Sequence, residues 1–115
     1  MKWSVTLKGV SDSGELLRFI EHAISGALSS TENYIADVSV TLRQTGKGQF
    51  RLKLCKVVII PLGSKAITVV STHISMRRAI ASAIRRSSTR LQKRLRRQNT
   101  LALRQTGIYV YQRNS

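Results

Sequence analysis

Residues 75–98, SMRRAIASAIRRSSTRLQKRLRRQ, combine one apolar stripe with a dense set of positive charges. Starting from Ile80, further apolar side chains follow at offsets of 4, 11 and 15 residues. On a helix these positions lie within about 60° of one another. They are Ile80, Ile84, Leu91 and Leu95. The pattern predicts a long amphipathic helix over residues 75–98, with Asn99 as its stop.

The beginning of the chain contains one strand pattern and one helix pattern. Residues 3–8 alternate apolar with polar side chains, which predicts a half-buried strand. Asp12 and Glu15 then have the spacing of a capping box. An apolar stripe with helical spacing follows over residues 16–28. We therefore expect a helix there that ends at residues 29–31.

Three further strands are predicted between the two helices, because alternating or β-branched segments are separated by turns that contain glycine. They cover residues 36–43, 50–60 and 66–74. The turns are short, so the three strands should form an antiparallel meander. Trp3 and Phe50 are predicted core residues. The uncovered face of the sheet is predicted to carry Thr6, Lys8, Thr41, Arg43, Arg51 and Lys53.

The element order is therefore β-α-β-β-β-α. It predicts an α+β fold, a two-layer sandwich in which both helices pack on one face of a four-stranded sheet. A length of 115 residues suits one domain, which we place at residues 1–98. Residues 99–115 form a C-terminal tail. Within the tail, residues 108–111 have strand propensity, which predicts either an extra edge strand or a mobile extension.

The charge of the chain is large and unevenly distributed. Lys and Arg total 20 against 5 Asp and Glu, a net charge of +15, and every acidic residue lies at or before position 37. A charge of this size indicates a polyanionic partner, usually nucleic acid. The alternative is a solvated cationic face without a specific partner, but such a face normally mixes both signs of charge.

The predicted binding surface lies on the basic helix, where Arg dominates and its planar fork matches phosphate oxygens. Two rows of side chains face away from the apolar stripe. One row consists of Arg86, Arg90, Lys93 and Arg97, and the other of Arg78, Arg85 and Arg96. Cations in the hairpin extend this surface if they lie close to the rows. The full set of predicted RNA-binding residues is Arg77, Arg78, Arg85, Arg86, Arg90, Lys93, Arg94, Arg96, Arg97, Lys47, Arg51 and Lys53.

The sequence offers no catalytic, cofactor or metal motif, so we predict a protein that is not an enzyme. The single cysteine, Cys55, excludes an internal disulfide and a multi-cysteine metal site. His22 and His73 lack further ligands at metal-binding spacing. The glycines at 46–48 lack the phosphate-binding P-loop pattern. Because no secretory signal or long apolar run is visible, we expect a cytoplasmic protein without a membrane partner or small-molecule substrate.

The order of elements, the length and the basic last helix resemble those of the short ribosome hibernation-promoting factors, also called ribosome-associated inhibitors. The resemblance covers about residues 1–97. It includes the strand over residues 3–10 that leads into a helix capped by Ser or Asp. It also includes the segment ISMRRAI at residues 74–80, which is similar to the entry into that family's final helix.

The resemblance implies a fold similar to double-stranded-RNA-binding domains, and it implies the small ribosomal subunit and its rRNA as partners. In that family the protein fills the decoding channel, overlaps messenger and transfer RNA, and idles the ribosome under stress. The first helix departs from the family pattern, since it offers only Arg18 against Glu15 and Glu21. Two alternatives remain open, namely a structural or assembly ribosomal protein and a sequence-independent nucleic-acid-binding domain. The matching positions are Arg78, Arg85, Arg86, Arg90, Lys93 and Arg97.

Overall fold

The structure, a computed structural model, describes residues 1–11, 13–46 and 51–106, with the backbone alone for residues 99–106. Its elements follow the predicted order, with one short 3-10 helix added. They are β1 (Lys2–Lys8), α1 (Gly14–Leu28), η1 (Ser29–Tyr34), β2 (Ile35–Thr45), β3 (Leu52–Pro61), β4 (Ile67–His73) and α2 (Met76–Thr106).

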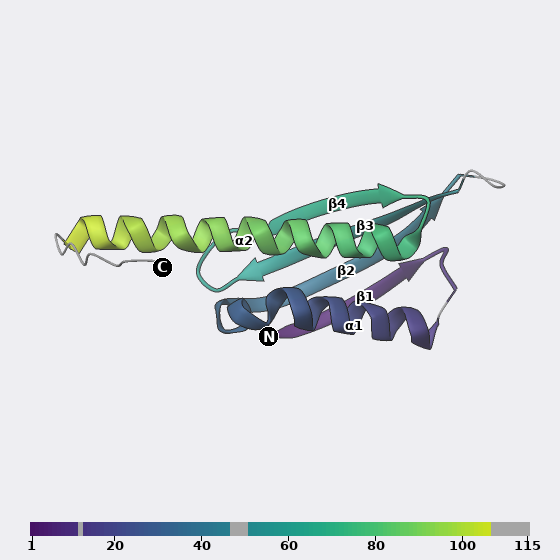
Figure 1. Ribbon diagram of the computed structural model, residues 1–115, viewed down its shortest axis with the longest axis horizontal. Helices are drawn as coiled ribbons and strands as arrows, with labels where there is room; N and C mark the ends of the chain where they lie inside the picture. Colours follow the sequence, from purple (N-terminus) through teal and green to yellow (C-terminus); the bar gives the residue numbers. More distant parts are fainter. Residues whose placement is uncertain (12, 47–50, 107–115) are drawn as a thin grey trace.

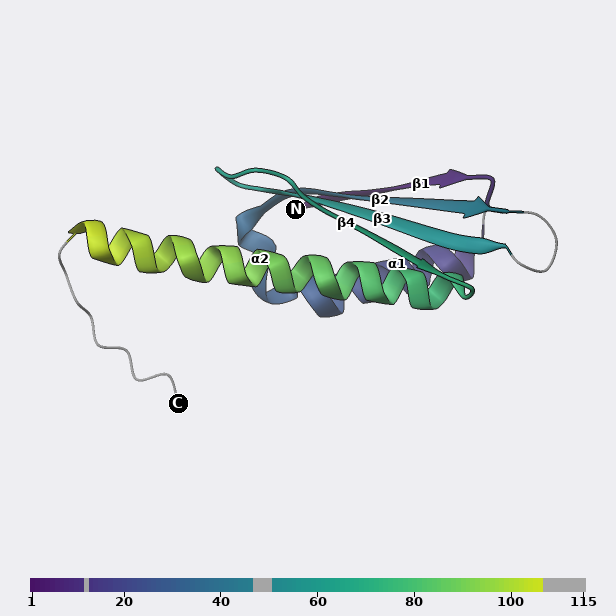
Figure 2. The same ribbon diagram turned by 90° about the horizontal axis from the view of Figure 1, so that it is seen from above.

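The predicted α+β sandwich is confirmed. The four strands form one sheet in the order β1-β2-β3-β4, in which β1 runs parallel to β2 while β2, β3 and β4 form the predicted antiparallel meander. Both helices lie on the same face of the sheet and leave the other face uncovered (Figures 1 and 2). The tight turn between β3 and β4 requires Gly63, whose φ of 73° is accessible to glycine without strain.

The core lies between this face of the sheet and the apolar stripes of the two helices. From α1 the buried side chains are Ile20, Ile24 and Leu28, as predicted. From α2, Ile80, Ile84 and Leu91 are buried, and Leu95 packs against them while partly exposed. Burying a side chain of this size stabilises the fold by roughly 1.5–3 kcal/mol. The sheet contributes Ile35, Val38, Val40, Leu42, Cys55, Val57, Ile59, Ile67 and Val69.

In β3 the buried and exposed residues alternate with the opposite phase from the prediction, which placed Arg51 and Lys53 on the uncovered face. Cys55, Val57 and Ile59 are buried, whereas Leu52 is 47% exposed. Residues 57–60, VVII, are apolar in both phases, so local alternation could not decide between them. Pairing with β2 and packing under α2 decide it, because a shift of one residue would exchange the two faces of the strand.

The reversed phase moves the cations of β3. Lys53 pairs with Gln44, on the face that the helices cover, so its predicted place on the uncovered face is wrong. Arg51 precedes the strand and is exposed. Lys56 takes the place on the uncovered face instead. The predicted positions of Thr6, Lys8, Thr41 and Arg43 on that face are confirmed by their pairing, Thr6 with Thr41 and Lys8 with Arg43.

The cap of α1 is also one residue away from the predicted one. Ser13 is the N-cap, and its side-chain oxygen accepts a hydrogen bond of 3.3 Å from the backbone N–H of Leu16. Asp12, the predicted capping residue, lies outside the described part of the chain. The cap orients the entry of the chain into α1 and satisfies a backbone donor that the helix itself leaves unpaired.

The helix α2 is longer than predicted and continues to Thr106, so Asn99 does not end it. Asparagine costs a helix interior less than about 1 kcal/mol and removes no backbone hydrogen bond. Residues 101–105, LALRQ, are good helix formers and continue the helix. With 31 residues the helix is roughly 46 Å long, and its last part extends beyond the sheet (Figure 2).

Two predicted core aromatics have different outcomes. Trp3 is 38% exposed, so its prediction as a core residue is wrong. It lies on the edge strand β1, where only one neighbouring strand flanks it, and it lines a shallow cavity with Glu21 and Ile24 of α1. Phe50 and the predicted strand at residues 108–111 lie outside the described residues.

Candidate nucleic-acid interface

The packing of α2 determines which of its side chains face solvent. The helix buries the large side chains of Ile80 and Ile84. It also buries the small residues Ala79, Ala83 and Ser87, which allow the helix to lie close to the sheet. The opposite side of the helix carries the predicted cations. All nine remain at the surface, eight of them exposed and Arg94 partly buried. At the start of the helix, the Ser75 hydroxyl accepts a hydrogen bond of 3.5 Å from the Arg78 backbone N–H.

One row of arginines lies along the free edge of the sheet. We call Arg86, Arg90 and Arg94 the edge row. The guanidinium of Arg86 donates to the Val70 carbonyl at 3.3 Å, and that of Arg90 donates to the Thr68 carbonyl at 3.1 Å. Arg94 donates to the Lys65 carbonyl and, at 3.5 Å, to the Ser64 hydroxyl.

The edge row satisfies backbone groups that would otherwise be open to another strand. Among the described residues, β4 is an edge strand that pairs with β3 alone, so one side of its backbone has no ladder there. Open edges invite pairing with another chain, and covering them prevents it. Sequence analysis missed this role because a repeat of four residues in a helix does not say which strand lies beside it.

A second group of cations has no such partner. We call Arg78, Arg85, Lys93 and Arg97 the outer set. Their side chains are exposed and make no hydrogen bond or ion pair with the described residues. These groups can bind an anion without first breaking an internal contact. The structure therefore divides the predicted row of Arg86, Arg90, Lys93 and Arg97 between two roles.

Both groups meet at one shallow cavity near the end of the sheet. It has a volume of about 290 Å³ and is lined by Arg90, Lys93, Arg94 and Arg97. The contacts with β4 and the turn that precedes it hold Arg90 and Arg94 in place. A guanidinium has five N–H donors, so one or two bonds to carbonyls leave others for a ligand. Four cations around one hollow are suited to a phosphate group.

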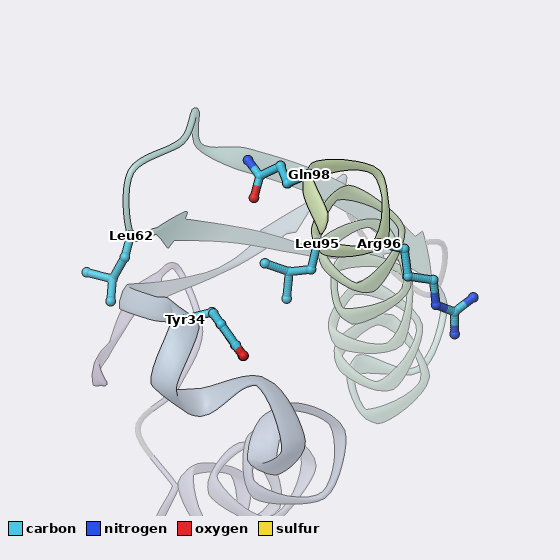
Figure 3. A pocket seen from close by; sticks show the side chains of 5 residues that line it. All are labelled: Tyr34, Leu62, Leu95, Arg96 and Gln98. Carbon is cyan, nitrogen blue, oxygen red and sulfur yellow. The ribbon is translucent and has the colours of Figure 1, made fainter. Parts of the chain in front are cut away.

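The other two predicted cations of α2, Arg77 and Arg96, belong to neither group. The guanidinium of Arg77 stacks over the Phe19 ring of α1, 5.2 Å from its centroid. Arg96 lines a separate cavity of about 510 Å³ with Tyr34, Leu62, Leu95 and Gln98. Figure 3 shows Leu95 directed toward the side of Tyr34 and Leu62, while the Arg96 side chain points away from them. This larger cavity is separate from the basic one.

The two described hairpin cations, Arg51 and Lys53, do not join the basic cavity. Lys53 pairs with His73, the last residue of β4, which lies three residues before the start of α2. Arg90 lies 14 residues after Met76, the first residue of that helix, so the cavity is roughly 20 Å further along. Arg51 lies at the same end as Lys53, and Lys47 lies outside the described residues.

The described part of the chain offers little that suggests other chemistry. It contains no group of three or more His, Cys, Asp or Glu side chains that could hold a metal ion. Burial raises the pKa of the Cys55 thiol to about 12, because the low-dielectric core disfavours the thiolate. A neutral buried thiol is a poor nucleophile. No described helix is both long enough and apolar enough to cross a membrane.

Comparison with solved structures identifies proteins of the same fold. A ribosomal subunit interface protein from Coxiella burnetii has a TM-score of 0.68 and 17% sequence identity, over 81% of this chain and 96% of that chain. The N-terminal domain of Protein Y from Thermus thermophilus has a TM-score of 0.65 and 14% identity, over 80% of this chain and 93% of that chain. No family model matches the sequence, and no curated protein matches it significantly. The resemblance expected from the sequence is thus confirmed for the fold.

Proposed function

We propose that this protein binds ribosomal RNA on the small ribosomal subunit and thereby suppresses translation. The observation that carries the proposal is the basic cavity of α2, where Arg90, Lys93, Arg94 and Arg97 meet with no acidic residue in the lining. The fold supports it, since the two similar structures are a ribosomal subunit interface protein and a domain of Protein Y.

The physical argument begins with the cost of collecting like charges. Repeated cations three and four residues apart destabilise a free helix by a few tenths of a kcal/mol per pair. Binding of a polyanion offsets this destabilisation through phosphate contacts and counterion release. The outer set adds Arg78 and Arg85 about 10–20 Å from the cavity along the helix, so α2 presents cations over several phosphate spacings.

The protein acts in this proposal by occupying a site and not by catalysis. Its described residues hold no cluster that could bind a metal ion, and the one cysteine is buried with a raised pKa. A small basic body on the small subunit would exclude the RNAs that translation needs there. Suppression then depends on saturating one site per ribosome.

Co-sedimentation with purified small subunits tests the proposal. We expect the protein to sediment with small subunits at about one copy each, and far less with large subunits. The variant Lys93→Glu with Arg97→Glu should lose this association. Its matched control, Lys2→Glu with Arg18→Glu, has the same net charge but lies on β1 and α1, away from the cavity, and should retain it.

A cell-free translation reaction tests the consequence. Inhibition should saturate near one protein per ribosome and should be opposed by preloaded messenger and initiator transfer RNA. Inhibition that needs a large excess, and that bulk competitor RNA relieves, would indicate general coating of RNA and contradict the proposal.

A further inference from the structure

A second basic site lies on the opposite side of the molecule, on the sheet face that no helix covers (Figure 2). Strand pairing puts Lys8 directly opposite Arg43, and Thr41 directly opposite Lys56. These four residues line a shallow cavity of about 260 Å³ together with Leu54 and Val70. Three strands contribute its cations, so the sheet itself fixes their relative positions.

The electrostatics of this cavity are unbalanced. Like charges directly opposite each other on neighbouring strands destabilise a sheet, yet Lys8 and Arg43 occupy such a pair. No acidic residue of the described part of the chain lines the cavity. On the same face, Asp37 pairs with Lys2 at the other end of the strands. Asp37 is six residues from Arg43 along β2, which is roughly 20 Å, too far to compensate the cations.

The chemistry of the lining favours a nucleotide chain over an isolated anion. Lys and Arg side chains and the Thr41 hydroxyl are the groups that commonly contact phosphate and sugar oxygens. Beside them, Leu54 is half-buried and Val70 is 45% exposed, which provides an apolar surface next to the charges. A phosphodiester chain offers both kinds of surface, since it alternates charged phosphates with sugars and bases.

We propose that Lys8, Arg43 and Lys56, with Thr41, form a second binding site for the backbone of single-stranded RNA. α2 and its cavity lie on the other side of the sheet, so one protein would hold two RNA segments at once. This inference goes beyond the proposed function and does not need the small subunit to be the partner.

A titration followed by NMR tests this site separately from α2. The full chain would carry Gln at Arg78, Arg85, Lys93 and Arg97, which weakens the basic surface of α2. A short oligouridine is then added. We expect saturable shifts of backbone amides around the uncovered face, at Lys8, Thr41, Arg43, Lys56 and Val70.

Two matched variants in the same background measure the contribution of the site. Changing Lys8, Arg43 and Lys56 to Gln should weaken oligouridine binding at least tenfold. Changing Lys2, Arg18 and Lys65 to Gln removes the same charge elsewhere and should change the affinity less than about threefold. Thermal melting checks that both remain folded. If the first variant does not fold, Lys8→Gln against Lys2→Gln gives the same comparison.

Several outcomes would overturn the inference. Oligouridine could leave the amides of the uncovered face unshifted, or the two variants could lose affinity equally, which would indicate non-specific charge. Shifts produced by poly-aspartate but not by oligouridine would identify an acidic protein surface as the occupant. Failure of the wild-type protein to sediment with small subunits would instead refute the proposed function and leave this titration unaffected.

Discussion

The edge row and the outer set are built from the same kind of side chain on the same helix, yet they differ in what they contact. Arg86, Arg90 and Arg94 donate hydrogen bonds to the backbone of β4 and the turn before it. The side chains of the outer set make no hydrogen bond or ion pair with the described residues. The difference arises from where each side chain lies around the helix and along it. Arg97, for example, shares a row with Arg86 and Arg90 but lies beyond Arg94, which contacts the turn before β4.

The cations of α2 therefore have two different roles. The edge row stabilises and protects the protein, while the outer set remains available for a partner. The basic cavity joins them, since Arg90 and Arg94 come from the first group and Lys93 and Arg97 from the second. Arginines already fixed by the fold need less ordering when a phosphate binds, which lowers the entropic cost of binding.

The largest expected effect is loss of binding when the outer set is reversed. Replacing Arg78, Arg85, Lys93 and Arg97 by Glu should weaken binding to small subunits on the order of 10³-fold or more, at about 1 kcal/mol for each lost contact. Filter binding with labelled small subunits measures it. Circular dichroism should match the wild type, because these side chains face solvent. Unchanged binding would show that the outer set does not contact the partner.

The salt dependence of binding should differ between variants of the two groups, and this difference is the second largest effect we expect. With about six phosphate contacts, log K should fall against log salt with a slope of about −4 to −5. Changing the outer set to Gln should reduce the magnitude of the slope by about 3, at roughly 0.7–0.9 per contact. The same change in the edge row should reduce it less. Equal reductions would mean that the two groups do not differ in function.

The third effect concerns stability, where changes in the edge row should matter more than changes in the outer set. Changing Arg86, Arg90 and Arg94 to Gln should lower the free energy of unfolding by about 1.5–4.5 kcal/mol, since each net hydrogen bond contributes about 0.5–1.5 kcal/mol. Urea denaturation measures it, and light scattering should detect more self-association through the open edge. The outer-set Gln variant, as control, should be as stable as the wild type or slightly more so.

The smallest expected effect belongs to Arg77, which contacts α1 instead of β4 or solvent alone. Arg77→Gln removes a cation–π contact with Phe19 and should cost about 0.5–1 kcal/mol of stability. Binding to small subunits should change only a few-fold. A large loss of binding would place Arg77 in the outer set, and its assignment to the helix–helix contact would then be wrong.

The two helices also differ in how much of the expected interface they supply. α1 carries Arg18 beside Glu15 and Glu21, so it offers no continuous basic surface. The cations of the covered side are therefore concentrated on α2, and the uncovered face of the sheet carries the other basic cavity. On the same fold, the distribution of charge therefore differs from the one that the resemblance suggested.

Sequence reasoning worked where one periodicity was unambiguous. The stripes of α1 and α2 each have a single helical period, and both predicted stripes lie in the core. It failed in β3, where residues 57–60 are apolar in both phases, and at Asn99, where a weak helix former does not end a helix. Trp3 was misassigned because alternation cannot distinguish an edge strand from a central one.

By itself, the sequence determined the order of elements, the α+β sandwich and the concentration of cations on its last helix, because periodicity and charge are local properties of the chain. Only the tertiary structure decided what each cation does. The alignment of α2 with β4 assigns Arg86, Arg90 and Arg94 to backbone carbonyls, and the register of β1, β2 and β3 gathers Lys8, Arg43 and Lys56. Both depend on contacts between residues far apart in the chain, which packing and strand register create and which no local pattern encodes.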